Sequence, residues 1–129
     1  MERKIRLAFL ILILTQAAHS IEEYRTRLYE VLAPARFISS LFSDDPAAGF
    51  LTANALLVAF GLFCWGLPVR LNWRGARGLA WFWTLLELGN GAGHLFFALN
   101  RGGYFPGAAT APLLLVLGTW LAFLLTRES

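Results

Sequence analysis

The sequence predicts an all-α membrane protein: a four-transmembrane-helix bundle with an interfacial amphipathic helix in its first outer loop. Of its 129 residues, 57% are hydrophobic and 15% are charged, and its mean hydropathy is +0.58. Soluble domains carry about 25% charged residues. The apolar residues form long blocks, and a spanning helix needs about 20 of them. Because lipid-exposed backbone must satisfy its own hydrogen bonds, these blocks are expected to be helices.

Four apolar blocks give the predicted spans of one membrane domain over residues 1–129. They cover residues 6–23, 49–69, 78–99 and 107–126. The first block also has the basic start and apolar core of a cleaved signal peptide, with small residues at Ala17 and Ala18. The residues before these alanines fit a cleavage site poorly, so a retained span is favoured.

The segment between the first two blocks, residues 24–48, has an amphipathic pattern. One helical face would carry its apolar residues, which are Tyr24, Leu28, Val31, Ile38, Leu41 and Phe42. Such a pattern favours a helix lying in the membrane interface, interrupted at Pro34. Asp44 or Asp45 then precedes Pro46 and is expected to cap the next helix.

Basic residues predict the orientation, because they concentrate on the cytoplasmic side of membranes. Seven would lie on the side of the termini: Arg3, Lys4, Arg6, Arg70, Arg74, Arg77 and Arg127. Four would lie on the opposite side: Arg25, Arg27, Arg36 and Arg101. We therefore expect a multi-pass protein of a bacterial-type inner or plasma membrane, with both termini in the cytoplasm.

The composition also limits the partners. The net charge of +3 is not gathered into a basic, aromatic-rich patch, so nucleic acid is not an expected partner. The single cysteine, Cys64, excludes a Cys-based metal cluster. The expected partners are membrane lipids and an apolar small molecule, and the sequence leaves the oligomeric state open.

Three titratable groups stand at the end of the first apolar block, in "QAAHSIEEYRTR". They are His19, Glu22 and Glu23, at spacing i, i+3 and i+4. Charged groups within a span usually face the interior of the protein and pair with one another. At about 1.5 Å per residue, His19 lies about 20 Å from the cytoplasmic end of its span.

The third block carries the expected partner groups. Glu87, Asn90 and His94 share one helical face, and His94 lies at a depth of about 22 Å. Gly89 and Gly93 form a small-residue pair that would let another helix approach closely. We therefore predict that spans one and three are in contact, with the two histidines facing each other.

The string "HSIEE" fits the pattern H-x-x-E-E, and the chain resembles the HXXEE-domain family of small multi-pass membrane proteins. The resemblance extends to Asn90 and His94 in "NGAGH" and to the following "RGGYFPGAATAP". In that ending, Tyr104, Pro106, Gly107, Thr110 and Pro112 match the family pattern. The resemblance implies a small multi-pass membrane protein and implies no activity.

Three interpretations of the polar residues remain open. In the first, His19, His94 and one of Glu22 or Glu23 bind a divalent metal, Zn or Fe, while the other glutamate acts as general base. Asn90 and Glu87 would then support the ligands from around the site. In the second, a glutamate–histidine pair performs metal-free acid–base chemistry or proton relay. In the third, the cluster only fixes helix packing.

The leading functional hypothesis is a metal-dependent membrane enzyme that acts on an apolar small molecule or lipid, with Glu22 and Glu23 as the candidate catalytic residues. The alternative is a non-catalytic or transport-related membrane protein with a structural or proton-relaying cluster.

Overall fold

The computed structural model describes residues 1–128, so Ser129, the last residue of the predicted domain, lies outside the described part. The described residues form helices and no strands, which confirms the all-α class. The elements are α1 (Arg3–Arg25), α2 (Leu28–Val31), α3 (Ala33–Ser40), α4 (Pro46–Cys64), the π-helical turn η1 (Trp65–Val69), α5 (Ala76–Arg101) and α6 (Ala111–Arg127).

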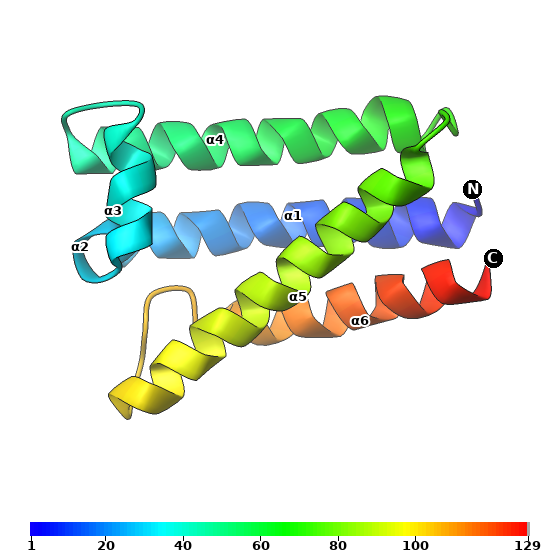
Figure 1. Cartoon of the computed structure of the whole chain (residues 1–129). Helices are drawn as coiled ribbons and strands as arrows, with labels where there is room; N and C mark the ends of the chain where they lie inside the picture. Colours follow the sequence, from blue (N-terminus) through cyan, green and yellow to red (C-terminus); the bar gives the residue numbers. More distant parts are fainter. Residues whose placement is uncertain (129) are drawn as a thin grey trace.

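Four long helices make up most of the molecule (Figure 1). Helix α1 packs against both α4 and α6, while α5 packs mainly along α6 and runs obliquely to α1 and α4. Both ends of the chain lie at the same end of the molecule. There the amino group of Met1 lies 3.9 Å from the carboxylate of Glu128, which also pairs with Arg77 at 3.3 Å.

Local sequence signals explain most helix ends. Asp45 accepts a hydrogen bond from the backbone N–H of Ala47 at 3.2 Å, so the predicted cap of α4 is confirmed. Gly102 ends α5 in the left-handed conformation that glycine adopts most easily. The fourth apolar block starts at residue 107, four residues before the helix that it contains. Gly107 has a φ of +95°, which belongs to a turn, and α6 begins at Ala111.

The segment after α1 folds into two short helices separated by an extended residue, Leu32, just before the Ala33–Pro34 start of α3. Small residues of α3 face α4: a Cβ added to Gly49 would lie 2.0 Å from the carbonyl oxygen of Ser39. The large residues of α3, including Phe37 and Ile38, are exposed. Of the apolar residues that the sequence pattern places on one face, Ile38, Leu41 and Phe42 are exposed, whereas Leu28 is buried. The interfacial helix therefore stays a prediction.

The predicted glycine contact surface of α5 is wrong. A Cβ added to Gly89 or Gly93 would meet no atom within 4 Å. The closely packed glycine is instead Gly91, where a Cβ would lie 2.9 Å from the carbonyl oxygen of Ala111. Two residues correspond to about 200° around a helix, so Gly91 faces α6 while Gly89 faces away from it.

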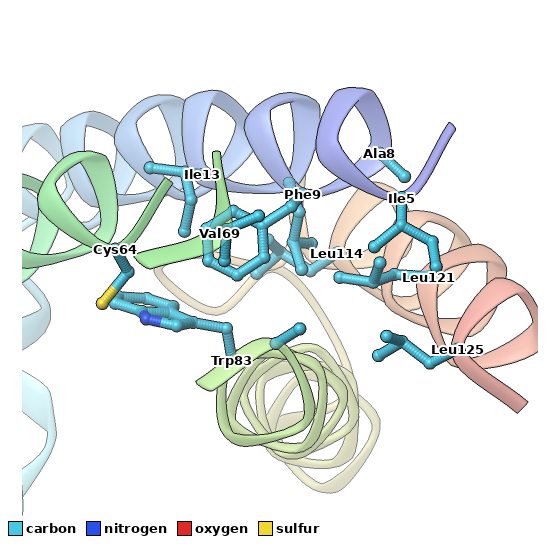
Figure 2. Packing of buried hydrophobic residues seen from close by; sticks show 12 residues of the cluster. Ile5, Ala8, Phe9, Ile13, Cys64, Val69, Trp83, Leu114, Leu121 and Leu125 are labelled. Atoms are coloured by element: carbon cyan, nitrogen blue, oxygen red, sulfur yellow. The ribbon is translucent and has the colours of Figure 1, made fainter. Parts of the chain in front are cut away.

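The main hydrophobic core lies in the half of the molecule that carries the termini (Figure 2). Phe9, Trp83 and Leu121, from α1, α5 and α6, are fully buried there, and the free cysteine Cys64 packs beside Trp83. The other half of α1 buries polar side chains, including Gln16, His19 and Glu23. The molecule therefore separates an apolar core from a polar one along the same helix.

By length and composition, two helices are suited to crossing a membrane. They are Arg3–Arg25 and Pro46–Val69, with mean hydropathies of 1.4 and 1.9. Ala111–Arg127 is also apolar but has only 17 residues.

Candidate metal centre

Helix α1 presents its two glutamates in different directions. Glu23 follows His19 by four residues, about 40° around the helix, so the two side chains point the same way. Glu22 is offset from His19 by about 60° in the opposite sense. As a result, Glu23 joins His19 on the side of α5, whereas Glu22 reaches the loop before α6.

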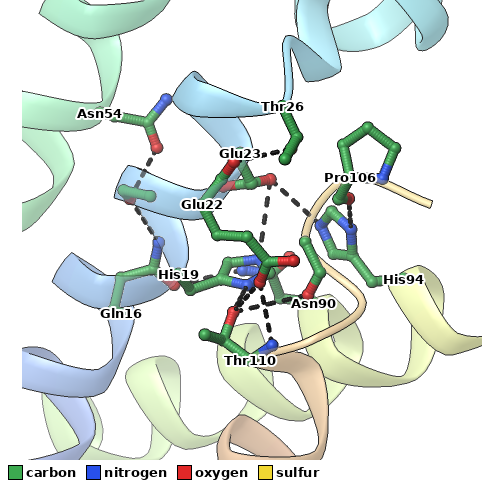
Figure 3. A network of polar contacts seen from close by, with 12 residues as sticks. Gln16, His19, Glu22, Glu23, Thr26, Asn54, Asn90, His94, Pro106 and Thr110 are labelled. Atoms are coloured by element: carbon green, nitrogen blue, oxygen red, sulfur yellow. Dashed lines mark hydrogen bonds and ion pairs between the residues drawn. The ribbon is translucent and has the colours of Figure 1, made fainter. Parts of the chain in front are cut away.

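Three ligand-type side chains converge between α1 and α5: His19, Glu23 and His94 (Figure 3). All three are buried, and their nearest ligand atoms lie within 4.8 Å of one another. Glu23 Oε2 lies 3.1 Å from His94 Nε2 and 3.6 Å from His19 Nε2. The two imidazole rings meet edge to face, with centroids 4.6 Å apart. The prediction that the histidines face each other is confirmed.

The tautomer of His94 follows from its hydrogen bond. Its Nδ1 lies 2.7 Å from the carbonyl oxygen of Pro106, which can only accept. Nδ1 therefore carries a proton and donates it. In a neutral imidazole Nε2 then has a free lone pair, and this lone pair faces Glu23.

The same reasoning applies to His19 through Thr110. The Thr110 hydroxyl lies 2.6 Å from Glu22 Oε1 and 2.6 Å from His19 Nδ1. A hydroxyl has one proton, which Thr110 donates to the carboxylate, so it accepts the proton of His19 Nδ1. His19 Nε2 is left as an acceptor, and it is buried without a hydrogen-bond partner among the described residues.

Glu22 anchors the loop before α6. Its Oε1 accepts from the backbone N–H and the hydroxyl of Thr110, and its Oε2 accepts from the backbone N–H of Ala109 and the hydroxyl of Tyr104. Burial and the adjacent Glu22 carboxylate raise the pKa of the Tyr104 phenol. Each carboxylate oxygen of Glu22 therefore accepts two hydrogen bonds. Glu22 lies outside the three-residue cluster and holds Thr110 against His19.

Glu87 and Asn90 belong to a second polar group, centred on Gln16. Asn90 Nδ2 donates to Gln16 Oε1 at 3.2 Å, and the amide of Gln16 donates to Ser20. The carboxylate oxygens of Glu87 lie 2.6 and 2.8 Å from the same Gln16 oxygen. Either the amide is turned so that its nitrogen donates to Glu87, or a protonated Glu87 donates to the oxygen.

The protonated form of Glu87 keeps every neighbouring bond intact. Ser20 accepts from the Gln16 amide and donates its only hydroxyl proton to Asn54 Oδ1 at 2.8 Å. If the Gln16 amide were turned, its oxygen would have to accept the hydroxyl proton of Ser20, which Ser20 already donates to Asn54. The hydrogen bonds therefore favour a neutral Glu87, which is fully buried.

A groove of about 660 Å³ opens beside the cluster, between α1, α3, α4 and α5. Four polar side chains line it on α1 and α5: Gln16, Glu23, Asn90 and His94. Most of the other lining residues are apolar, among them Phe50, Leu57 and Leu86. Its size falls within the range of about 300–1,000 Å³ that is usual for small-molecule sites.

The structure thus brings together His19, Glu23 and His94, with Asn90 beside them, and it places Glu22 and Glu87 in neighbouring networks. Sequence reasoning assigned no site role to Thr110, Pro106 or Gln16. The "YFPGAAT" string, which carries the first two, was the available signal. Ser20 and Asn54 had no comparable signal.

Comparison with known proteins identifies one family. The family model described as "Protein of unknown function with HXXEE motif" matches residues 10–121. No curated protein and no solved structure matches the chain.

Proposed function

The chain belongs to the HXXEE family, and from that premise we propose that it is a metal-dependent integral membrane enzyme acting on an apolar small molecule or lipid. The observation that carries this proposal is the convergence of three acceptor atoms, His19 Nε2, Glu23 Oε2 and His94 Nε2. Three acceptors in a buried space repel one another unless a proton or a cation lies between them.

The donor set and its spacing fit a divalent metal. Catalytic zinc sites use three protein ligands from His and Asp or Glu, at about 2.0–2.2 Å, and keep one position open. Ligand atoms at the corners of such a tetrahedron are about 3.3 Å apart. The Glu23–His94 and Glu23–His19 separations are 3.1 and 3.6 Å, and all three ligand atoms lie within 4.8 Å of one another. Each histidine also donates its other ring N–H, as metal-bound histidines almost always do.

The side chains around the cluster then have separate roles. His19, Glu23 and His94 would hold the metal, and a zinc or iron ion there would polarise a carbonyl or activate a water. Thr110 and Pro106 orient the two imidazoles. Glu22 fixes Thr110, and because donors occupy both of its oxygens it is less suited to general-base chemistry. Asn90, which lines the groove beside His94, is placed to contact a substrate.

The surface supports a membrane location. Large apolar side chains are exposed along all four long helices, for example Leu14, Phe63, Phe96 and Phe123 at 54%, 48%, 59% and 54%. Soluble proteins do not expose so much contiguous apolar surface. The interior, by contrast, holds His19, Glu87 and other polar groups. Buried polar groups beneath an apolar surface are the arrangement expected when lipid surrounds the protein.

We further propose four spans with both termini in the cytoplasm of a bacterial-type inner or plasma membrane, as the basic residues predict. The proximity of Met1 and Glu128 supports a common side for the two termini. Reporter fusions at the C-terminus and in the loop at Ser43 should give signals from opposite sides of the membrane. Signals from the same side would contradict the topology.

A second candidate function is metal-free acid–base chemistry or proton relay. The 3.1 Å separation between Glu23 Oε2 and His94 Nε2 is also a hydrogen-bond distance. In that case one proton, shared by the pair, would replace the metal, and His19 Nε2 would stay unpaired in a buried site. The metal satisfies all three acceptors at once and is therefore the leading proposal.

Metal analysis separates the two candidates. The protein is purified through a tag that binds no metal, without chelators, and its zinc and iron contents are measured. Wild type should contain about one equivalent, and His94→Ala and Glu23→Gln should lose it, because two ligands do not hold a stable site. Glu30→Gln is the matched control, since Glu30 is exposed and pairs only with Arg27. A metal-free wild type, unable to take up added zinc, would overturn the metal proposal.

A further inference from the structure

We propose that the groove beside the cluster binds a single-chain, lipid-like molecule with an uncharged polar head, and that the chain enters sideways from the bilayer. This inference rests on the proposed function and specifies its substrate class. The head would lie next to Glu23, Asn90 and His94, and the chain would lie along Leu57 and Leu86.

The lining of the groove has a partly polar wall and an apolar wall. Four polar side chains come from α1 and α5, and Asn54 of α4 is the remaining polar side chain in the lining. Leu57, Leu85 and Leu86 line the part of the groove that lies toward the apolar half of the molecule. A ligand that matches this division has one polar group at the end of an apolar chain.

The rim of the groove shows from which side a ligand enters. Ile38 of α3 and Leu85 of α5 both line the groove, and they are 46% and 62% exposed. The groove therefore opens through an apolar rim on the side of the helices. Lipid covers such a surface in a membrane protein, so an apolar chain reaches the groove without crossing water.

The charges around the groove exclude an anionic head. No lysine or arginine lines it. The two positive charges of a divalent ion in the cluster would be balanced by the carboxylates of Glu23 and of Glu22, which is joined to His19 through Thr110. Arg36, on the neighbouring helix α3, donates to the backbone carbonyls of Tyr29 and Glu30 at 3.2 and 2.7 Å and lines a separate hollow. A phosphate or carboxylate head would therefore bring an uncompensated negative charge into a buried site, which costs several kcal/mol.

Two glycines of α5 provide a matched pair of variants. Gly89 lines the groove, whereas Gly93, one turn further along, is not among its lining residues. A Cβ at either position would meet no atom within 4 Å, so both accept a side chain without a backbone clash. Replacing either glycine also favours the helix to the same extent. Gly89→Phe fills the groove, and Gly93→Phe is its control.

The test uses full-length protein in lipid nanodiscs, because detergent could occupy the groove. The probe is N-methyl dodecanamide carrying a photoreactive diazirine on its chain, and crosslinked peptides are identified by mass spectrometry. We expect crosslinks in peptides containing Leu57 or Leu86. Unlabelled N-methyl dodecanamide should compete at least about tenfold better than dodecanoate, a difference of about 1.4 kcal/mol. N-methyl acetamide, which has no chain, should not compete.

Gly89→Phe should lose the crosslink, and Gly93→Phe should retain it. Equal or better competition by dodecanoate or by dodecyltrimethylammonium would overturn the uncharged head. Unchanged crosslinking of Gly89→Phe would overturn the groove as the site. Metal content is measured on the same samples, and the crosslink does not depend on it. Metal-loaded protein without the crosslink refutes this inference alone, whereas metal-free protein refutes the proposed function.

Discussion

Replacing Thr110 by valine removes one hydroxyl while keeping the shape of the side chain. That hydroxyl lies 2.6 Å from both His19 Nδ1 and Glu22 Oε1, and it connects the loop before α6 to a predicted metal ligand. In Thr110→Val the buried Nδ1–H of His19 loses its acceptor. The ring can then rotate or change tautomer, and Nε2 is no longer held toward Glu23.

The size of the effect follows from the group left unpaired. A buried donor without a partner costs about 1–3 kcal/mol. The Glu22 carboxylate loses less stabilisation, since three other hydrogen-bond donors still contact it. A loss of about 1.4–2.8 kcal/mol corresponds to a 10–100-fold weaker affinity. The same range is typical when a hydrogen-bond partner of a metal-bound histidine is removed. We therefore expect zinc affinity to fall about 10–100-fold.

The assay is a competition titration of zinc between the protein and a chelator of known affinity. Thr84→Val is the control, because Thr84 is also fully buried and its hydroxyl donates only to the carbonyl of Ala80 in its own helix. Thr110→Ser should restore most of the affinity, since it keeps the hydroxyl. Melting temperatures without metal separate a binding effect from a loss of folding.

The reasoning about His19 fails if Thr110→Val binds zinc within about twofold of wild type, a difference of about 0.4 kcal/mol. It also fails if Thr84→Val weakens binding as much as Thr110→Val. Either result would mean that the hydroxyl of Thr110 does not orient the imidazole.

Two other substitutions test the surroundings of the cluster. Gly107→Ala should lower metal content strongly, because its Cβ would lie 2.4 Å from His94 Nδ1 at a φ of +95°. Gly103→Ala is the control and should keep its metal, because a Cβ there would meet no atom within 4 Å. Equal metal contents in the two variants would contradict the close packing of Gly107 against His94. Glu87→Gln should keep the melting temperature near that of wild type and remove a carboxylic-acid band from the infrared spectrum, because a neutral Glu87 donates to Gln16 and an amide can replace it. A strongly destabilised variant, or an unchanged band, would show that Glu87 is not the neutral acid.

The helices themselves could be read from the sequence because their signals are local. Long apolar blocks, Asp45 before Pro46, and Gly102 after α5 act within a few residues of where they occur. The facing histidines were also predictable, since the helical rise places both at the same level once the two helices are predicted to start at the same end of the molecule. The confirmed contact between His19 and His94 shows that positions along two helices can predict which side chains meet.

Features that depend on relative rotation of the helices were not predictable. Gly89 and Gly91 are both small residues of one helix, and only the position of α6 decides that Gly91 is the packed one. The distinction between Glu22 and Glu23 has the same origin, because both lie near the face of His19. The two glutamates differ because the loop before α6 donates its backbone N–H groups to Glu22.

In the segment from Tyr104 to Thr110, the apolar composition of the sequence hides a turn. The fourth apolar block begins with Gly107 and two alanines, which read as helix in a window average. The positive φ of Gly107 breaks that helix, and the released segment brings Pro106 and Thr110 to the two histidines. Their role as partners of the imidazoles becomes visible only in three dimensions.

X-ray absorption spectroscopy of the zinc-loaded protein tests the central claim most directly. If His19, Glu23 and His94 hold the metal, the spectrum should contain two imidazoles, with Zn–N distances of about 2.0–2.1 Å, and further oxygen ligands at similar distances. His94→Ala treated with the same amount of zinc should lack this two-imidazole site, because the two remaining ligands do not hold the metal stably. A wild-type spectrum without imidazole scattering, or one that His94→Ala leaves unchanged, would contradict the account.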